Sequence, residues 1–313
     1  MHGNSSYHPL VSVIIPNYNH APFLKERIDS VLNQTYQNFE VILLDDCSTD
    51  NSREIIETYR ENTHVSHIVF NEVNSGSTFL QWKKGLDLAE GIWIWIAESD
   101  DVADPHFISE LLVNSEAEIL YCNSKIIDAS SQPTSLYGFT NMPNKESHRC
   151  FSGDFTMNAS AFLLEWMLRD NFIPNASAVL FKKSLLSDCV TYQKRLHEMG
   201  KMKLAGDWYF WLTLLLKSSY ISYHARSLNA FRQHSSNVRL RTTKNSFTEL
   251  HYILTVLKEH NLPINLTVDT YLYRYFHRNK DAHFTFSEKL TLWKNAWRFG
   301  FLGLYIKNVV KYR

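Results

Sequence analysis

The chain has 313 residues, of which 44% are hydrophobic and 20% charged, so it is long enough to bury a sizeable core without disulfides or metal staples. Its 32 basic and 32 acidic residues cancel, which disfavours a nucleic-acid partner recruited by overall charge. Aromatic residues make up 14%. Such rings often line sugar sites, but they also fill cores.

The cysteines and the N-terminus bear on the compartment. Cys47, Cys122, Cys150 and Cys189 are widely spaced and form no C-x-x-C pair, so we predict neither a zinc site nor a disulfide framework. Residues 1–9 are polar, and no apolar run is long enough to cross a bilayer. We therefore expect a cytoplasmic protein, which could still touch the inner face of a membrane.

Short apolar runs alternate with amphipathic segments in the first third of the chain. Such alternation predicts an α/β fold with a mostly parallel sheet, right-handed crossovers and a ligand site beyond the carboxyl ends of the strands. The expected strands are Val11–Ile15, Phe39–Leu44, Val65–Phe70 and Ile92–Ala97, and the expected helices start near Pro22, after the capping-rich segment Ser48–Ser52 and at Phe79.

The pattern is less regular between residues 104 and 235 and becomes strongly helical beyond Val238. We find no internal repeat and no low-complexity tract. The expected elements are helices at Phe107–Val113, Phe162–Arg169, Lys183–Ser187, Trp208–Leu216 and Phe247–His260, a strand at Ile119–Ile127 and a loop-rich excursion at Gln132–Asp154.

Three carboxylates lie within four residues in the segment Glu98-Ser99-Asp100-Asp101, directly after a predicted strand. A divalent cation would neutralise their repulsion, and hard oxygen ligands suit Mg²⁺ or Mn²⁺, which could then hold a diphosphate. The alternative is a solvated acidic turn or a helix cap before Pro105.

The end of the second predicted strand is also acidic. Asp45 and Asp46 could accept hydrogen bonds from a nucleobase or a ribose, whereas we expect Asp50 to cap the following helix. The segment Pro16–His20 stands where a dinucleotide fold would carry its glycines, and the chain has no Walker-type loop. These features argue against a nicotinamide dehydrogenase and a P-loop NTPase.

Five segments lie in this order along the chain: Val11–Asn19, Ser30–Tyr36, Asp45–Ser52, Asn74–Gly76 and Glu98–Asp101. Taken together, they resemble the opening of the family 2 glycosyltransferases. The resemblance is close over residues 9–115 and looser to about 240. It implies a GT-A type, Rossmann-like fold, a nucleoside-diphosphate sugar donor (a UDP-sugar above all), a Mn²⁺ or Mg²⁺ ion and mostly inverting transfer.

The resemblance also implies roles for single residues. Asp100 matches the metal-binding Asp of the family's DXD motif. Glu98 stands where an Asp is commoner, so the division of metal and ribose duties among Glu98, Asp100 and Asp101 stays open. The residues that match the family's nucleotide site are Pro16, Asn17, Tyr18, Asn19, Asp45 and Asp46, with Glu98 and Asp101 flanking the metal.

Two later segments extend the match. Ala205–Trp208 resembles the family's acidic-Asp-Trp segment, which implies that Asp207 is the general base, although by itself Asp207 could simply cap a helix. Arg232–Asn237 resembles a C-terminal motif in which His234 would complete the metal or diphosphate site. Arg232 or Arg239 could meet phosphate charge.

We therefore expect a GT-A catalytic domain over residues 1–240, with a nucleotide-sugar half (9–115) and an acceptor half (116–240), followed by a helical extension (241–313). The expected function is inverting sugar transfer from a nucleoside diphosphate to a carbohydrate or lipid-linked acceptor hydroxyl, in surface polysaccharide or glycolipid assembly. The alternatives are a non-catalytic nucleotide-sugar binding module and a nucleotidyltransferase, although the latter usually carries a Gly/Arg/Lys-rich loop after the first strand.

The tail from Phe286 to Arg313 is basic and carries two tryptophans. A helix of this kind could lie on an anionic membrane. It could equally pack on the catalytic domain or on a second subunit.

Overall fold

The fold is built on one large sheet whose first strands are the apolar runs of the sequence. The computed structural model describes residues 10–136, 151–173, 175–187, 189–203, 205–234, 246–268 and 286–311. The strands are β1 (Val11–Asn17), β2 (Phe39–Asp45), β3 (Val65–Phe70), β4 (Trp93–Ile96), β5 (Val102–Ala103), β6 (Ile119–Ile127), β7 (Pro133–Leu136), β8 (Phe155–Asn158), β9 (Val179–Lys182) and β10 (Tyr220–Arg232).

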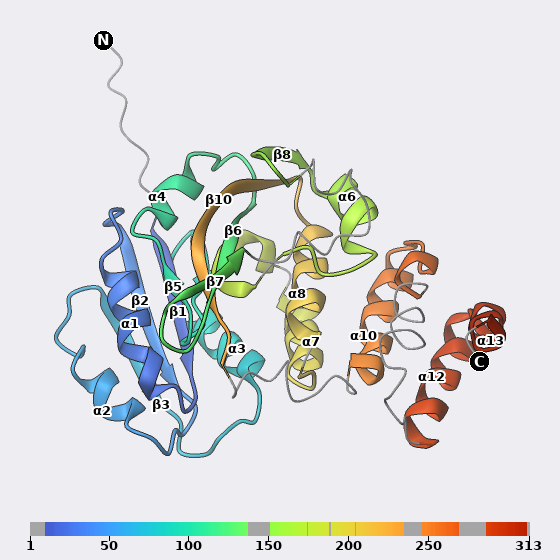
Figure 1. The fold of residues 1–313 in the computed structure, drawn as a ribbon, viewed down its shortest axis with the longest axis horizontal. Coiled ribbons are helices and arrows are strands. Elements are labelled where there is room, and N and C mark those ends of the chain that lie inside the picture. The colour runs from blue at the N-terminus through green and yellow to red at the C-terminus, as the bar shows by residue number, and fades with distance from the viewer. Residues whose placement is uncertain are drawn as a thin grey trace, which may run out of the picture.

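Helices flank this sheet and continue beyond it (Figure 1). The α-helices are α1 (Ala21–Leu32), α2 (Ser52–Glu57), α3 (Thr78–Leu88), α4 (Phe107–Leu112), α6 (Ala159–Phe162), α7 (Cys189–Met199), α8 (Gly206–Leu215), α10 (Ser246–Glu259), α12 (Phe286–Phe299) and α13 (Leu302–Lys311). A π-helical turn, η2 (Leu163–Met167), and the 3-10 turns η3 (Ala176–Ala178) and η4 (Lys183–Leu186) complete the described elements.

The direction of the strands decides where the site lies. The sheet order is β3-β2-β1-β4-β9-β6-β10-β5, with β7 on β6 and β8 on β10. Strands β1 to β4 are parallel, and β9 is antiparallel to both β4 and β6, so β6 and its parallel partner β10 run in the same direction as the first four. The expected α/β sheet is confirmed. The carboxyl ends of β1, β2, β4 and β10 therefore meet at one edge.

Side chains alternate between the two faces of the sheet, as the pleat requires. Val13 and Ile15 of β1 belong to the cluster that includes Leu24 and Ile28 of α1. Ile14, between them, belongs to the other cluster, with α3 and the later helices. Both faces are covered, which explains why the first strands read as continuous apolar runs.

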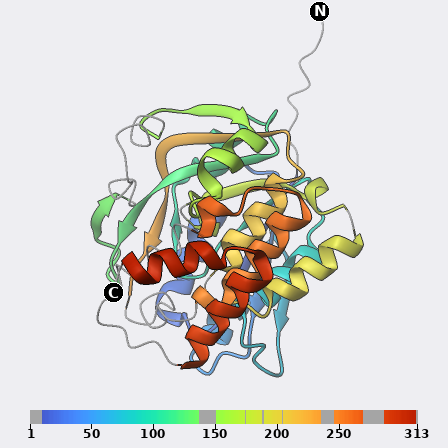
Figure 2. The ribbon, with the colours of Figure 1, turned by 90° about the vertical axis from the view of Figure 1, so that its right-hand side faces the viewer.

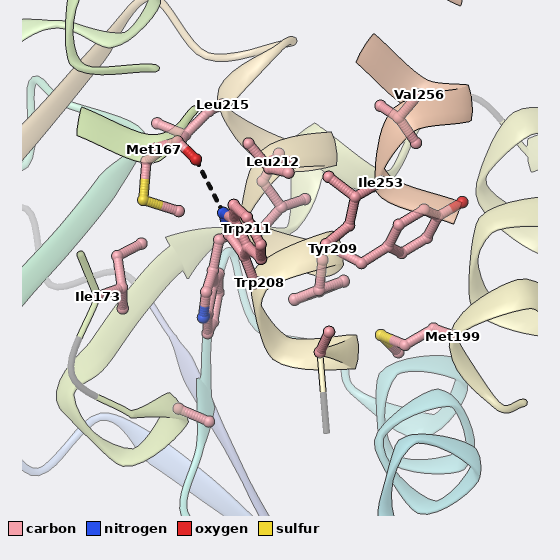
Figure 3. Packing of buried hydrophobic residues seen from close by; sticks show 14 of the residues in the cluster. Met167, Ile173, Met199, Trp208, Tyr209, Trp211, Leu212, Leu215, Ile253 and Val256 are labelled. Atoms are coloured by element: carbon pink, nitrogen blue, oxygen red, sulfur yellow. Dashed lines mark hydrogen bonds between the residues drawn. The ribbon is translucent and has the colours of Figure 1, made fainter. Parts of the chain in front are cut away.

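The C-terminal helices form no core of their own. They join the cluster of Ile14 and α3, which we call the main hydrophobic cluster. Leu254 of α10 and Leu292 of α12 belong to the same buried set as Trp211 of α8. Figure 3 shows α8 packed between residues 167–173 and α10, with the Trp208 indole donating to the Met167 carbonyl oxygen at 2.9 Å. Among the described residues, none of the helices combines the length and hydropathy that a bilayer crossing requires.

Several later elements differ from the sequence prediction. The expected helix at residues 162–169 is the short α6 followed by the π-helical η2, and the expected helix at 183–187 is a 3-10 turn. Strand β9 was not predicted, and β10, which ends at Arg232, is 13 residues long. Part of the loop-rich excursion is β7, and residues 137–150 lie outside the described part.

Candidate active site at the carboxyl edge of the sheet

In the acidic turn after β4, Asp101 is buried and Glu98 and Asp100 are half-buried. A Glu98 carboxylate oxygen accepts a hydrogen bond from the Trp82 indole N–H at 2.7 Å, and Asp101 accepts one from the Arg232 main-chain N–H at 2.9 Å. Burial, and next the charge of Asp100, raise the pKa of Glu98 to about 8 and that of Asp101 to about 7. The cluster therefore resists carrying three negative charges, and a cation bound there would relieve this cost.

Asp100 meets two histidines from distant parts of the chain. The ligand atoms of His20, Asp100 and His234 all lie within 4.8 Å of one another, and the Asp100 Oδ2 lies 3.0 Å from the His234 Nε2. The ring centroids of the two histidines are 5.4 Å apart. Burial raises the pKa of Asp100, but the hydrogen bond to His234 and the charge of His20 outweigh burial and hold that pKa below its usual value.

This group fits a divalent cation by its chemistry, because one carboxylate and two imidazoles are common ligands of first-row metals. The two nitrogen donors favour Mn²⁺ over Mg²⁺, which prefers oxygen ligands. The structure thus brings together the predicted metal residues Asp100 and His234. The sequence reasoning missed His20, although it directly follows the segment Pro16–Asn19. Its Nδ1 lies 2.8 Å from the Ser99 hydroxyl.

The positively charged side chain of Arg27 is buried beneath the acidic turn. Arg27 of α1 is fully buried, donates from Nε to the Glu98 carbonyl oxygen at 3.0 Å and lies 5.1 Å from the Trp95 ring centre. Burial lowers the pKa of Arg27 to about 10, against the charges of Asp101, Asp100 and Glu98. Sequence reasoning missed it, although Arg27 lies on the helix face of Leu24, Ile28 and Val31.

The polar residues at the ends of β1 and β2 hold each other. The Asn17 amide donates to the Asp45 carboxylate at 2.8 Å, and Asp45 also accepts from the Ser48 main-chain N–H at 2.9 Å. Asn19 has a left-handed backbone, with φ of 54°, and its side-chain oxygen accepts from the Thr49 N–H. These bonds shape the edge of the sheet.

Of the predicted nucleotide-site residues in this region, Tyr18 is the exposed one, at 45%, whereas Pro16, Asn17, Asp45 and Asp46 are buried. Tyr18 therefore presents a free aromatic face beside the buried polar residues. Direct contact of these residues with a nucleotide stays a prediction.

Asp46 organises the loop before α3. Its Oδ1 accepts from the Asn71 amide at 2.6 Å, the Ser75 N–H at 2.9 Å and the Gln81 amide at 2.8 Å, and its Oδ2 accepts from the Ser75 hydroxyl at 2.7 Å. These four donors take up most of what a carboxylate can accept. Asp46 is thus a scaffold for the loop.

Asp50 has the capping role that the sequence predicted. Its carboxylate accepts from the main-chain N–H of Ala21, the first residue of α1, at 2.9 Å and from that of Ser52, the first residue of α2, at 3.0 Å. Both bonds satisfy N–H groups that a helix leaves free.

Arg232 is committed to the protein and is not available to a phosphate in this structure. Its guanidinium donates to the Asp100 carbonyl at 2.6 Å and to the Glu26 carboxylate at 2.6 Å, and also to Asp128 and Ser131. The suggestion that Arg232 meets phosphate charge is therefore wrong for this arrangement. Arg239 lies outside the described residues.

Asp207 lies in the first turn of α8. Its carboxylate accepts from the Asn171 amide at 3.1 Å and from the Trp208 N–H at 2.7 Å. Asn171 is six residues before Ser177, whose hydroxyl accepts from the Glu98 N–H at 3.0 Å. One short segment therefore touches both the candidate base and the acidic turn.

Helix α3 joins three of the predicted regions directly. Its Gln81 donates to Asp46 at 2.8 Å and its Trp82 donates to Glu98 at 2.7 Å. Its Phe79 packs so closely on Gly206 that a Cβ there would lie 2.4 Å from the ring. The regions of Asp46, Glu98 and Asp207 therefore lie around the first half of one helix, which the sequence reasoning did not single out.

Comparison with known proteins supports the family resemblance that the sequence motifs indicated. Residues 12–161 match the family described as glycosyl transferase family 2. The chain carries a family 2 glycosyltransferase domain. GlyG, a glycosyltransferase of Streptococcus pneumoniae serotype 4, is 32% identical over 164 residues, which cover 50% of this chain and 54% of GlyG.

Two further relatives of the family 2 domain are named for polysaccharides. TuaG of Bacillus subtilis, named for teichuronic acid biosynthesis, is 38% identical over 97 residues, covering 31% of this chain and 38% of TuaG. WcaA of Escherichia coli K12, named for colanic acid biosynthesis, is 29% identical over 170 residues, covering 52% of this chain and 59% of WcaA. These matches span 38% to 59% of the lengths of the three curated relatives.

The fold around the family 2 domain is of the GT-A type. TarS 1–349 of S. aureus in complex with UDP-GlcNAc superposes with a TM-score of 0.68 at 17% identity, covering 92% of this chain and 80% of TarS 1–349. The same protein in complex with UDP gives a TM-score of 0.65.

Proposed function

We propose that this protein is an inverting, metal-dependent glycosyltransferase, which moves a sugar from a nucleoside diphosphate to an acceptor hydroxyl. The observation that carries the proposal is the convergence of Asp100, His20 and His234 at the carboxyl edge of a family 2 domain, with Asp207 linked to the same turn through α3. A nucleotidyltransferase or a non-catalytic binding module has no comparable support.

A UDP-sugar is the proposed donor. TarS, which shares the fold, is known in complexes with UDP and UDP-GlcNAc. Tyr18, exposed beside the buried pair Asn17 and Asp45, offers a flat ring on which a base could stack. Glu98 and Asp101 are the proposed partners of the ribose or of metal-bound water.

His20, Asp100 and His234 are the proposed ligands of a Mn²⁺ or Mg²⁺ ion. When bound, such an ion would neutralise the negative charge of the diphosphate leaving group. Arg27 and Arg232, which both donate to the main chain of the acidic turn, hold that turn in place.

The proposed reaction is a single in-line displacement. The bond between the acceptor oxygen and the anomeric carbon forms as the bond from that carbon to the diphosphate oxygen breaks, so the configuration inverts. Asp207 takes the proton of the acceptor hydroxyl. Asn171 and the Trp208 N–H orient the carboxylate for this transfer. The nucleoside diphosphate leaves with the electron pair of the broken bond.

The proposed acceptors are the glycans or glycolipids of surface polysaccharide assembly, because relatives are named for teichuronic and colanic acid biosynthesis. We further propose that the protein works in the cytoplasm. Cys47 and Cys122, both unpaired in the structure, would stay reduced in that compartment.

The test separates binding from transfer. Asp207→Asn keeps the size of the side chain but removes its basicity, so we expect transfer to fall by at least about a hundredfold while the thermal shift induced by UDP-sugar and Mn²⁺ persists. The matched control is Asp87→Asn, which alters an exposed carboxylate on α3 that pairs with Lys83. Normal turnover by the Asp207 variant would remove that residue from the mechanism. Donor binding by the wild type with neither transfer nor donor hydrolysis would favour a binding module.

A further inference from the structure

Helix α12 divides its residues between two opposite faces. Leu292, Ala296 and Phe299 are buried and belong to the main hydrophobic cluster, and the Lys258 ammonium of α10 lies 5.5 Å from the Phe299 ring centre. This face fastens the helix to the body of the protein. One face of α12 therefore packs on the rest of the protein, as one of the alternatives for the tail proposed. The opposite face does not.

The other face of α12 presents tryptophan to solvent. Trp293 is 46% exposed and Trp297, one turn later, is 72% exposed. Leu290 extends the same stripe, and Ile306 of α13 is also exposed. Single exposed apolar side chains are common, but several along one helix face form a patch, and such a patch marks an interaction surface.

Basic residues lie beside this stripe. Lys294 and Arg298, each next to one of the tryptophans, are exposed. Residues 289–313 contain six basic residues and no acidic one, in a chain whose overall net charge is zero. Positive charge is therefore concentrated at this end of the sequence, and the complementary partner of the exposed face of α12 is an anionic surface.

The two helices also form the outer layer of the protein on this side. In Figure 1 they lie at the end of the molecule opposite β3 and α2, and the turned view in Figure 2 shows them in front of the other elements. A large flat surface could therefore approach α12 and α13 without meeting the sheet.

We propose that this face, formed by Leu290, Trp293, Lys294, Trp297 and Arg298, docks on an anionic phospholipid membrane. The indoles would insert at the level of the headgroups, and the cations would pair with lipid phosphates. A second copy of the chain is the poorer partner. A two-fold contact would bring the basic face of one copy against that of the other, and like charges would repel.

The experiment is co-sedimentation of the full chain with vesicles of pure phosphatidylcholine and of phosphatidylcholine with 30% phosphatidylglycerol (about three in ten lipids anionic, enough to set a surface potential). We expect pelleting only with the anionic vesicles and release at high salt. Trp293→Ser/Trp297→Ser and Lys294→Glu/Arg298→Glu should each weaken vesicle binding by about twentyfold or more.

Matched controls carry the same changes at other exposed positions. Tyr220→Ser removes an aromatic residue that is 50% exposed, and Lys201→Glu/Lys217→Glu reverses two exposed charges. Both should bind vesicles like the wild type. Unchanged thermal stability and donor-induced stabilisation would show that the α12 variants are folded, independently of the proposed transfer reaction.

Three results would overturn the proposal. Equal binding to neutral and anionic vesicles, or no binding to either, would exclude an anionic membrane as the partner. Light scattering that shows a dimer in the wild type and a monomer in Trp293→Ser/Trp297→Ser would assign the face to a second copy of the chain.

Discussion

The Glu249 carboxylate of α10 accepts a hydrogen bond from the main-chain N–H of Ala205 at 2.8 Å, two residues before Asp207. Its other oxygen accepts from the Lys203 N–H at 2.7 Å, and the side chain is buried. Residue 249 lies beyond the segment that matches the family, and α10 belongs to the predicted extension. The C-terminal helices therefore help to position the turn that carries the candidate base.

Replacing Glu249 by Gln should disturb this turn, because an amide presents one oxygen and one nitrogen to two N–H groups. We expect the free energy of unfolding to fall by about 1–3 kcal/mol and kcat to fall by about tenfold or more, with donor binding nearly unchanged. Urea denaturation and steady-state kinetics would measure both effects.

The control for this variant is Glu259→Gln, which removes the charge from the ion pair of α10 with Arg195 of α7 but leaves the turn before Asp207 alone. It should lose stability without a comparable loss of kcat. Equal kinetic losses in the two variants would mean that Glu249 acts only through the stability of the helices.

The acidic turn predicts a pH dependence of stability in protein stripped of metal. The pKa values of Glu98 and Asp101 are raised to about 8 and about 7 from 4.5 and 3.8, so the folded state holds protons that the unfolded state releases. The stabilisation is complete below the unfolded values and is lost as the pH rises toward 8, with a slope of up to about 1.4 kcal/mol per pH unit for each proton.

Urea denaturation between pH 5 and 8 (about the window set by the two shifts) in the presence of a chelator would measure this slope. Glu98→Gln stays neutral in both states, so its slope should be shallower. A variant with the same slope as the wild type would show that Glu98 is ionised in the folded protein.

Mn²⁺ should bind to the group of His20, Asp100 and His234 more tightly than Mg²⁺, because two of the three ligands are nitrogen. Calorimetric titration should show that Asp100→Asn and His234→Gln each weaken Mn²⁺ binding by about tenfold or more, and that His20→Gln also weakens it. His260→Gln, at an exposed position of the chain, is the control. Undiminished Mn²⁺ affinity in His20→Gln would restrict the site to the two residues that the sequence predicted.

Gly206 should tolerate no larger residue, because a Cβ would lie 2.4 Å from the Phe79 ring. Gly206→Ala should cost about 1–3 kcal/mol of unfolding free energy, and Phe79→Leu in the same protein should restore part of it. Gly153→Ala, where nothing lies within 4 Å of the added atom, should be nearly neutral. Urea denaturation would measure these free energies of unfolding. An unchanged value in Gly206→Ala would mean that α3 and α8 can move apart.

The local pattern of the sequence was enough to predict the first half of the sheet. The strands near residues 11, 39 and 65 and the helix from about 79 are confirmed, because the period of apolar residues acts within one element. Strand β9 escaped prediction because four residues carry little period of their own. It owes its structure to its antiparallel neighbours, β4 and β6.

For the candidate site, too, the sequence predicted one part and only the structure revealed the rest. The sequence by itself determined which residue types are available, such as the acidic turn at 98–101 and the Asp at 207, and the family that they resemble. The resemblance already implied that His234 completes the site of Asp100. Only the tertiary structure added His20, because His20 and His234 follow strands far apart in the chain whose carboxyl ends meet at one edge. It also decided that Asp46, Arg27 and Arg232 are buried and held by the protein. Burial and hydrogen-bond partners depend on how distant segments pack, and no local pattern of residues carries that information.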